Sequence, residues 1–246
     1  MKIKIRKLLF IYGVLFFTAP FLYAQQTAIN INAWSGVSFF RGDGAAKNAT
    51  MSTAPFYSPA VIVTNPYGKQ PGFSYAVELV AQRLTKTKFI YGAGLGFEAL
   101  ASKVHIDSVY VEPEVIIFPS HTTFPANGKV LQHNSFITLH PFAGRRLVCH
   151  KISVDIVAGV DLGFCLNSNE KGSATYTVSN NAYQLAVSQE LAKPSIDVRP
   201  GVQIKTRYNK WALAAGYSLG LTNFKTYGEG KAYTNIVKLG MSYQLR

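Results

Sequence analysis

The sequence predicts an all-β protein, an eight-stranded antiparallel transmembrane β-barrel with short periplasmic turns and long extracellular loops. Three observations lead to this prediction. The N-terminus has the pattern of an export signal, apolar residues alternate with small or polar ones along the rest of the chain, and the connections between these runs are short and long in turn. Alternation with a period of two is typical of a β-strand with one apolar face.

The composition excludes two classes of protein. The 246-residue chain has 15% charged and 13% aromatic residues, whereas disordered chains are rich in charge and poor in aromatic residues. Its two cysteines are too few for a disulfide scaffold. The formal net charge of +13 is a feature that many nucleic-acid-binding proteins share. Its meaning depends on where the basic residues lie.

Residues 1–24 have the three parts of a secretory signal peptide. Four basic residues within the first seven are followed by an apolar run to Tyr23 and by Ala24, a small residue suited to cleavage. The alternative is a membrane-anchoring helix, which is disfavoured because Pro20 and the polar residues after Ala24 interrupt the span. We therefore expect residues 1–24 to be removed on export and residues 25–246 to form one barrel domain.

The alternation is clearest in residues 210–222. Every second residue from Trp211 to Leu221 is large and apolar or alanine, and the residues between them are small. Soluble strands have about five or six residues, whereas a tilted strand that crosses a bilayer needs about 9–11. The same pattern recurs in residues 28–41, 73–84, 89–100, 132–146, 151–167, 195–208 and 232–246. In 132–146 the apolar face is either Ile137 and Leu139 or Phe136 and Phe142.

The connections between these strands alternate in length. Short ones lie near residues 85–88, 147–150 and 209–210, and long ones at 42–71, 103–131 and 168–194, with a shorter fourth near 225–231. Outer-membrane barrels have this arrangement, with the short turns in the periplasm. The alternative is a soluble lipocalin-like barrel or a β-sandwich with its polar face in water. The glycines among the charged residues of that face favour a narrow barrel interior instead.

Eight charged residues are predicted to face the barrel interior. They are Glu78, Glu98, Asp155, Asp161, Asp197, Arg199, Lys205 and Lys238. The interior of an eight-stranded barrel is just wide enough for its own side chains, and an isolated buried ion is costly. We therefore expect opposite charges to pair and to fill the interior, so that the barrel has no open pore.

Nine basic residues lie at or beside the predicted short turns and the C-terminus. They are Arg83, Lys86, Lys88, Arg145, Arg146, Lys151, Arg207, Lys210 and Arg246. They account for the excess of nine basic over acidic residues that remains once residues 1–24 are removed. Because they are spread around one rim, they indicate contact with anionic headgroups of outer-membrane lipids at the periplasmic leaflet and no nucleic-acid binding.

The last predicted strand carries Lys238, Gly240, Tyr243 and Leu245. This order of a polar residue, a glycine and two spaced aromatic or apolar residues resembles the C-terminal assembly signal of outer-membrane barrels. It departs from that signal in having Leu245 where phenylalanine is commonest, and one further residue, Arg246. With the export signal and the eight strands, the chain is similar to small eight-stranded outer-membrane barrels, and among them to the PorT-like group of Bacteroidota. The resemblance implies an outer-membrane location, contact with the barrel assembly machinery and, for some members, a link to protein secretion.

The sequence offers few candidates for catalysis or cofactor binding. Residues 92–97 match a dinucleotide-binding glycine pattern only in part, since Phe97 replaces its third glycine, and glycines facing the barrel interior are the better interpretation. No histidine has metal-ligand spacing, so no metal or cofactor is expected. His140, near Asp155 on an adjacent predicted strand, is the candidate for a catalytic site at the barrel rim. A histidine satisfied by a neighbouring carboxylate is the favoured interpretation.

Two shorter features have structural interpretations. Cys149 and Cys165 lie at opposite ends of one predicted strand, roughly 50 Å apart, which is too far for a disulfide. Residues 41–43 spell Arg-Gly-Asp, an integrin-recognition tripeptide that is equally an ordinary turn sequence.

We therefore expect a monomeric, non-enzymatic outer-membrane barrel. It would act as an anchor, as a surface for partner binding or adhesion, or as a secretion accessory, with an extracellular or secretion-system protein as partner. The alternatives are an outer-membrane lipid-modifying enzyme that uses His140, and a soluble exported lipocalin-like carrier.

Overall fold

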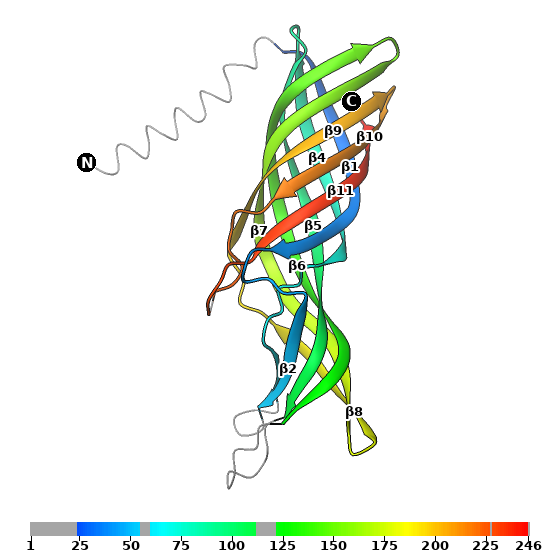
Figure 1. Ribbon diagram of the computed structural model, residues 1–246. Coiled ribbons are helices and arrows are strands. Elements are labelled where there is room, and N and C mark those ends of the chain that lie inside the picture. Colours follow the sequence, from blue (N-terminus) through cyan, green and yellow to red (C-terminus); the bar gives the residue numbers. More distant parts are fainter. Residues whose placement is uncertain (1–23, 55–59, 112–121, 227, 246) are drawn as a thin grey trace, which may run out of the picture.

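The computed structural model describes residues 24–54, 60–111, 122–226 and 228–245. These residues form eleven β-strands and no helix, so the prediction of an all-β protein is confirmed (Figure 1). In this described part, no helix has the length and hydrophobicity that a membrane crossing needs. The predicted signal peptide, except for Ala24, lies outside the described residues.

Eight strands close into a ring. They are β1 (Ala24–Arg41), β4 (Gln70–Thr85), β5 (Phe89–Val111), β6 (Thr122–Cys149), β7 (Ile152–Val178), β9 (Ile196–Tyr208), β10 (Trp211–Leu219) and β11 (Tyr233–Gln244). Each pairs antiparallel with both of its neighbours in the order β1-β4-β5-β6-β7-β9-β10-β11, and β11 pairs again with β1. All eight predicted strands are present, and closure leaves the ring without a free edge.

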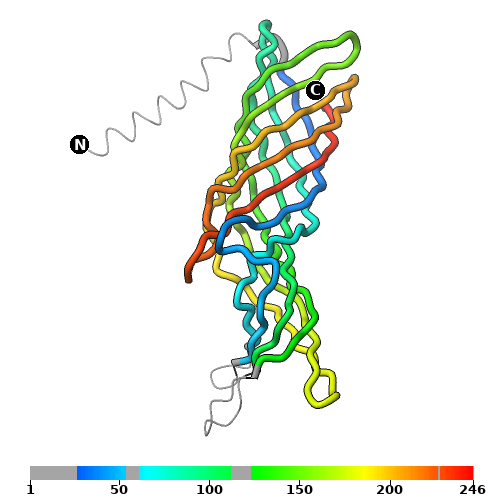
Figure 2. The backbone as a smooth tube through the Cα atoms, viewed as in Figure 1, coloured from blue at the N-terminus to red at the C-terminus, as the bar shows by residue number. Residues whose placement is uncertain are grey.

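The short turns that join neighbouring ring strands all lie at one end of the ring (Figure 2). They are residues 86–88, 150–151 and 209–210, between β4 and β5, β6 and β7, and β9 and β10. Lys88, His150 and Asn209 have positive φ angles of 64°, 53° and 52°, as tight hairpin turns commonly require. The start of β1 is at the same end, because Ala24 pairs with Thr85.

The prediction of long loops at the other end is wrong for most of their length. Strands β5, β6 and β7 continue past the ring, and β2 (Asn48–Ala54), β3 (Ala60–Val63) and β8 (Asn181–Glu190) join them (Figure 1). Strand β2 runs parallel to β5, β3 pairs with β2, and β8 folds back on β7. We name residues 48–54, 60–63, 103–111, 122–131 and 169–190 the extension.

The extension has an apolar core of its own. Its buried members are Ala49, Met51, Val63, Val104, Ile106, Val109, Val130, Ala174 and Val187. Burial of such side chains stabilises a fold by roughly 25 cal/mol for each Å² of apolar surface removed from water. These strands are therefore a packed continuation of the ring.

The ring has the opposite polarity. Most of its large apolar residues point outward, with Leu213 and Leu239 each 65% exposed, while the eight charged residues predicted for its interior are buried. Among the described residues, all but two of the exposed large apolar side chains lie on or directly beside the ring strands; the exceptions are Ile62 and Tyr183. In residues 132–146, Ile137 and Leu139 are on the outer face, whereas Phe136 and Phe142 are inside, which resolves the ambiguous face.

Candidate functional site

The charged interior of the ring is the candidate site. The eight residues expected there are all buried, with exposed fractions between 0% and 7%. Glu78 and Glu98 come from β4 and β5, Asp155 and Asp161 from β7, three residues from β9 and Lys238 from β11. Each occupies an inward position of its strand. Because successive residues of a strand point to opposite faces, the alternation in the sequence predicts these positions.

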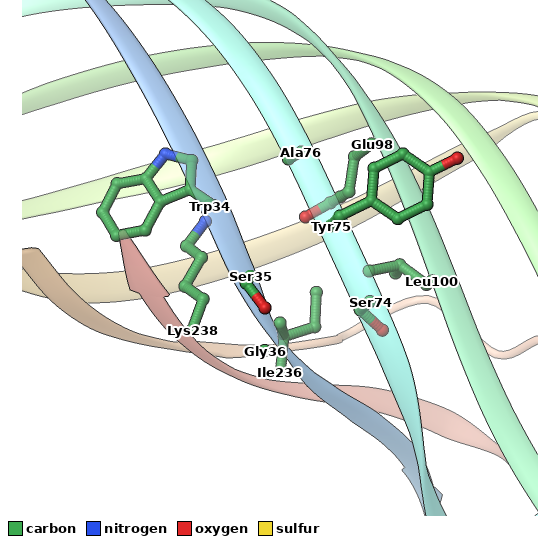
Figure 3. Close-up of a pocket in the computed structure, with 10 residues that line it drawn as sticks. All are labelled: Trp34, Ser35, Gly36, Ser74, Tyr75, Ala76, Glu98, Leu100, Ile236 and Lys238. Carbon is green, nitrogen blue, oxygen red and sulfur yellow. The ribbon is translucent and has the colours of Figure 1, made fainter. Parts of the chain in front are cut away.

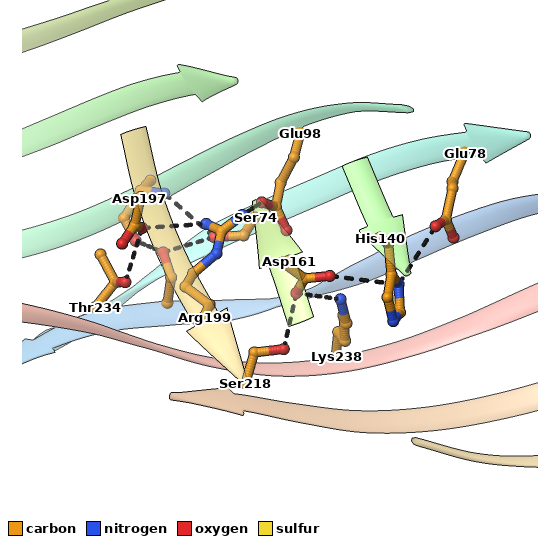
Figure 4. A network of polar contacts seen from close by, with 12 residues as sticks. Ser74, Glu78, Glu98, His140, Asp161, Asp197, Arg199, Ser218, Thr234 and Lys238 are labelled. Atoms are coloured by element: carbon orange, nitrogen blue, oxygen red, sulfur yellow. Dashed lines mark hydrogen bonds and ion pairs between the residues drawn. The ribbon is translucent and has the colours of Figure 1, made fainter. Parts of the chain in front are cut away.

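Arg199 lies at the centre of one cluster (Figure 4). Its guanidinium donates a hydrogen bond to Glu98, which comes from a strand across the ring, and its Nη1 lies 3.5 Å from Asp197 Oδ2. Asp197 also accepts a hydrogen bond of 3.1 Å from the Thr234 hydroxyl. The guanidinium carbon lies 5.1 Å from the centre of the Phe136 ring. One cation thus serves two carboxylates, and an aromatic face covers it.

Asp161 lies at the centre of a second cluster (Figure 4). Its Oδ2 accepts hydrogen bonds from Lys238 Nζ at 3.3 Å and from the Ser218 hydroxyl at 3.0 Å. Its Oδ1 lies 3.3 Å from His140 Nδ1, which is also 3.4 Å from Glu78 Oε1. The histidine therefore bridges two carboxylates.

A third group lies nearer the short turns. Arg146 holds Asp155 with two hydrogen bonds of 2.6 and 2.7 Å, the strong bidentate geometry of an arginine and a carboxylate. Arg207 donates to Asn30 and Gln244. The Lys205 ammonium lies 5.8 and 5.3 Å from the ring centres of Trp34 and Phe142.

The prediction that Arg146 and Arg207 contact lipid headgroups as part of the basic rim is therefore wrong. Both occupy inward positions of their strands, and Arg146 reaches the buried carboxylate of its β7 register partner Asp155. With these two residues, five cations face five carboxylates inside the ring. The inward position of Arg146 could be predicted from the sequence, because Arg146 is an even number of residues from His140 and therefore lies on the same face of β6.

Glycines make room for these side chains. A Cβ atom added at Gly94 would lie 1.8 Å from Glu78 Oε1, and one at Gly159 would lie 2.5 Å from His140 Nε2. No side chain fits at such distances without displacing its neighbour. Gly94 and Gly159 therefore leave the space that the side chains of Glu78 and His140 occupy.

Side chains fill the middle of the ring. A cavity beside Trp34, Glu98 and Lys238 measures about 10 Å³, which is room for about one water molecule (Figure 3). The interior carboxylates lie against arginine, lysine or histidine side chains in place of water, whereas the Lys205 ammonium lies against the rings of Trp34 and Phe142.

His140 does not lie at the rim. It is buried, and its ring packs edge-on against Phe142 with the centroids 5.4 Å apart. The Ser218 hydroxyl beside this cluster donates to Asp161, so it is not held as a nucleophile by His140. Among the described residues, no group of three or more His, Cys, Asp or Glu side chains could hold a metal ion. The thiols of Cys149 and Cys165 are both free.

Both charged residues of the tripeptide Arg41-Gly42-Asp43 form hydrogen bonds within the protein. The Arg41 guanidinium donates to Asn235 Oδ1 at 3.0 Å and to the Gly220 carbonyl at 2.9 Å. The backbone N–H of Lys231 donates to Asp43 Oδ1 at 2.7 Å, and this hydrogen bond holds the pKa of Asp43 below its usual value. Gly42 has a φ of 105°, a conformation that favours glycine. The tripeptide thus ties the end of β1 to the segment before β11.

Of the other rim residues, Lys86, Lys88, Arg145, Lys151 and Lys210 are exposed at the end with the short turns, and Arg83 is half-buried. Arg246 lies outside the described residues. In the predicted assembly signal, Lys238 pairs with Asp161, and the ring of Tyr243 lies 4.7 Å from that of Trp211. A Cβ atom at Gly240 would meet the Trp34 ring at 2.5 Å. Leu245 is exposed.

Comparisons with known proteins give no family. No family model matches the chain, and no curated protein matches it. The crystal structure of Neisserial surface protein A (NspA) is similar, with a TM-score of 0.36 and 10% identity over 89% of this chain and 99% of that one. A Pseudomonas aeruginosa FadL homologue has a TM-score of 0.19 and 8% identity, over 89% and 90% of the two chains. At these values the likeness identifies neither a family nor a function, and membership of the PorT-like group stays a prediction.

Proposed function

We propose that the protein is a monomeric, non-enzymatic integral outer-membrane β-barrel that holds the extension outside the membrane as a surface for a protein partner. One observation carries this proposal: the ring exposes most of its large apolar side chains on its outer face and buries charged residues, most of them in ion pairs, in its interior. A water-soluble protein rarely exposes so extended an apolar surface, whereas a transmembrane barrel requires one facing lipid.

The aromatic residues at the two ends of the ring support the same proposal. Phe89, Tyr208 and Trp211 flank the short turns, and Tyr243 packs against Trp211. At the other end of β4, Phe73 and Tyr75 are exposed with their ring centres 6.4 Å apart. Tryptophan and tyrosine concentrate at the two interfaces of a bilayer, where their polar atoms reach water.

The two alternatives fit the structure less well. A lipocalin-like carrier needs an apolar cavity for its ligand, whereas the interior of this ring is charged and filled. A lipid-modifying enzyme needs a reactive group that a lipid can reach, whereas His140 is buried between two carboxylates.

The orientation follows from the ends of the ring. Short turns are periplasmic in outer-membrane barrels, so the extension is the extracellular part. Its apolar core makes it a preformed platform for an extracellular or secretion-system partner. We further propose that the barrel assembly machinery recognises the last strand through Lys238, Gly240, Tyr243 and Leu245.

Labelling of single cysteines in intact cells tests both location and orientation. In a background with Cys149→Ser and Cys165→Ser, a membrane-impermeant maleimide should label Lys171→Cys, which is exposed in the extension. The matched variant Lys210→Cys, exposed at a short turn, should be labelled only after the cells are broken. Equal labelling of both variants in intact cells, or recovery of the protein from the periplasm without detergent, would contradict the proposal.

A further inference from the structure

We propose that the outer surface of the ring carries a binding site for one anionic phospholipid. An acyl chain would lie in a groove across β5, β6, β7 and β9, and the phosphate would contact Arg145. This inference rests on the proposed membrane-embedded barrel, because the groove is on the surface that would face lipid.

The groove has a volume of about 500 Å³. Two alanines, Ala143 on β6 and Ala158 on β7, are register partners and both are exposed. Larger apolar side chains surround this pair, and they are Phe89, Leu147, Ile156 and Val202. All four are exposed. Two adjacent small residues among large ones leave a depression with apolar walls, whose shape suits a hydrocarbon chain.

Positive charge lies at the side of the groove nearest the short turns. Arg145 lines the groove, is exposed, and is the register partner of Phe89. The backbone carbonyl of Lys88, the residue before Phe89, accepts a hydrogen bond of 2.8 Å from the backbone N–H of Arg146. The turn at residues 86–88 therefore lies beside Arg145 on β6. The exposed side chains of Lys86 and Lys88 add further positive charge.

No carboxylate neutralises this charge from the neighbouring strands. Residues 86–91 and 143–151 contain no acidic residue. Asp155, the acidic residue of β7 closest to this end, is buried inside the ring and bound by Arg146. An arginine with its apolar stem along a groove and its guanidinium at the interface is suited to a phosphate.

These features identify the ligand class by complementarity. The apolar groove selects an acyl chain, and the basic residues beside it select a negatively charged headgroup. Under the proposed orientation the groove opens near the periplasmic leaflet, so a phospholipid is the occupant.

Native mass spectrometry tests the proposal on the full-length mature protein. The protein would be reconstituted in nanodiscs of equal parts phosphatidylglycerol and phosphatidylcholine and released in the spectrometer. We expect one retained phosphatidylglycerol per barrel in preference to phosphatidylcholine. Arg145→Gln should lower that preference about fivefold, the usual effect of one basic residue near a lipid surface. Ala143→Leu should displace both lipids, because it fills the groove.

Two matched variants serve as controls. Lys210→Gln removes an exposed basic residue at another short turn, and Ala215→Leu enlarges an exposed alanine on β10. Both should retain the wild-type adduct. An equal loss in Lys210→Gln, a protein dimer in place of the lipid adduct, or an absence of selectivity would overturn the lipid site while leaving the membrane barrel intact. Failure to enter nanodiscs at all would overturn both proposals.

Discussion

The ring and the extension share three continuous strands but have opposite polarity. On β5, Leu95 and Phe97 lie outside the ring and Glu98 lies inside it. Farther along the same strand, Val104 and Ile106 are the buried residues. The same alternate positions of β5 face inward from Glu98 to Ile106. Only their residue types change, from charged to apolar. Under the proposed function, this reversal reflects two different surroundings, lipid around the ring and water around the extension.

A layer of aromatic and aliphatic side chains separates the two regions. Phe40, Tyr67, Phe136 and Phe224 are buried in one cluster. Phe40 contacts Tyr67 and Phe224 edge-on, with ring centroids 5.3 and 5.2 Å apart. Phe136 in turn covers Arg199. The charged interior is therefore closed off on the side of the extension, which strengthens the electrostatic attraction within it.

The largest expected effect is at the centre of the charged interior. Arg199→Ala leaves the buried carboxylates Glu98 and Asp197 without their cation, and should destabilise the protein by about 3–5 kcal/mol. Urea unfolding in lipid vesicles measures this change. The double variant Arg199→Met with Glu98→Gln should recover part of the loss, since it removes charge from both partners. An unchanged midpoint in Arg199→Ala would show that these charges are not coupled.

The next effect distinguishes two exposed positions. Leu239→Arg on the ring should cost about 2–4 kcal/mol, because it places a charge in the lipid around the barrel. Thr175→Arg, exposed in the extension, should change stability by less than about 0.5 kcal/mol, as ordinary surface substitutions do. The same unfolding experiment measures both. Equal effects would remove the distinction between the two regions.

A smaller effect is expected at the glycine stripe. Gly94→Val places a side chain against Glu78 and should cost about 1–3 kcal/mol through overpacking. The comparison is Ala93→Val on the outer face of the same strand, which should be close to neutral. If Gly94→Val unfolds at the same urea concentration as Ala93→Val, the packing of Glu78 over Gly94 is not required.

The smallest effect concerns a buried carboxylate of the extension. Burial raises the pKa of Glu170, and its Oε2 has no hydrogen-bond partner among the described residues, while Oε1 accepts from Gln189. Because the pKa is raised in the folded state, this residue favours folding below the ordinary pKa of glutamate, and that contribution is lost as the pH rises through the raised pKa.

Glu170→Gln should therefore stabilise the β7–β8 hairpin at pH 7.5 by about 1 kcal/mol, because the neutral amide removes a charge that is costly to bury. Near pH 4 the difference from the wild type should vanish. Hydrogen exchange of residues 169–190, corrected for intrinsic rates, measures this change. A benefit that is the same at both pH values would show that ionisation of Glu170 is not its cause.

The ring could be predicted from the sequence because its strands alternate cleanly. The alternation did not predict the extension, because the apolar residues of β5 change faces after Phe97, and Leu100 is already buried. Beyond this point Val104 and Ile106 still alternate with the polar residues Lys103, His105 and Asp107. They share the face of Glu98, however, so the alternation no longer matches a strand whose apolar face points outward. Alternation with the parity of Glu98 continues to Ile106, where a register shift before Ser108 brings Val109 to the buried face.

The interior residues were predictable, but their partners were not. Parity places Asp161 and Arg199 inside the ring, and the register makes them direct neighbours on β7 and β9. Arg199 nevertheless binds Glu98 from across the ring, and Asp161 binds Lys238. Which charges meet depends on closure of the ring and on the space left by its glycines, and neither can be read from one strand at a time.

Nitroxide labels on the two regions test the central claim most directly. Single cysteines at Leu239 and at Thr175, with Cys149 and Cys165 replaced by serine, would be spin-labelled and reconstituted in vesicles. We predict that the label on the ring is more accessible to oxygen, which concentrates in lipid, and that the label on the extension is more accessible to a water-soluble nickel complex. If both labels are equally accessible to the nickel complex, the exposed apolar face of the ring does not lie in a membrane and the account is wrong.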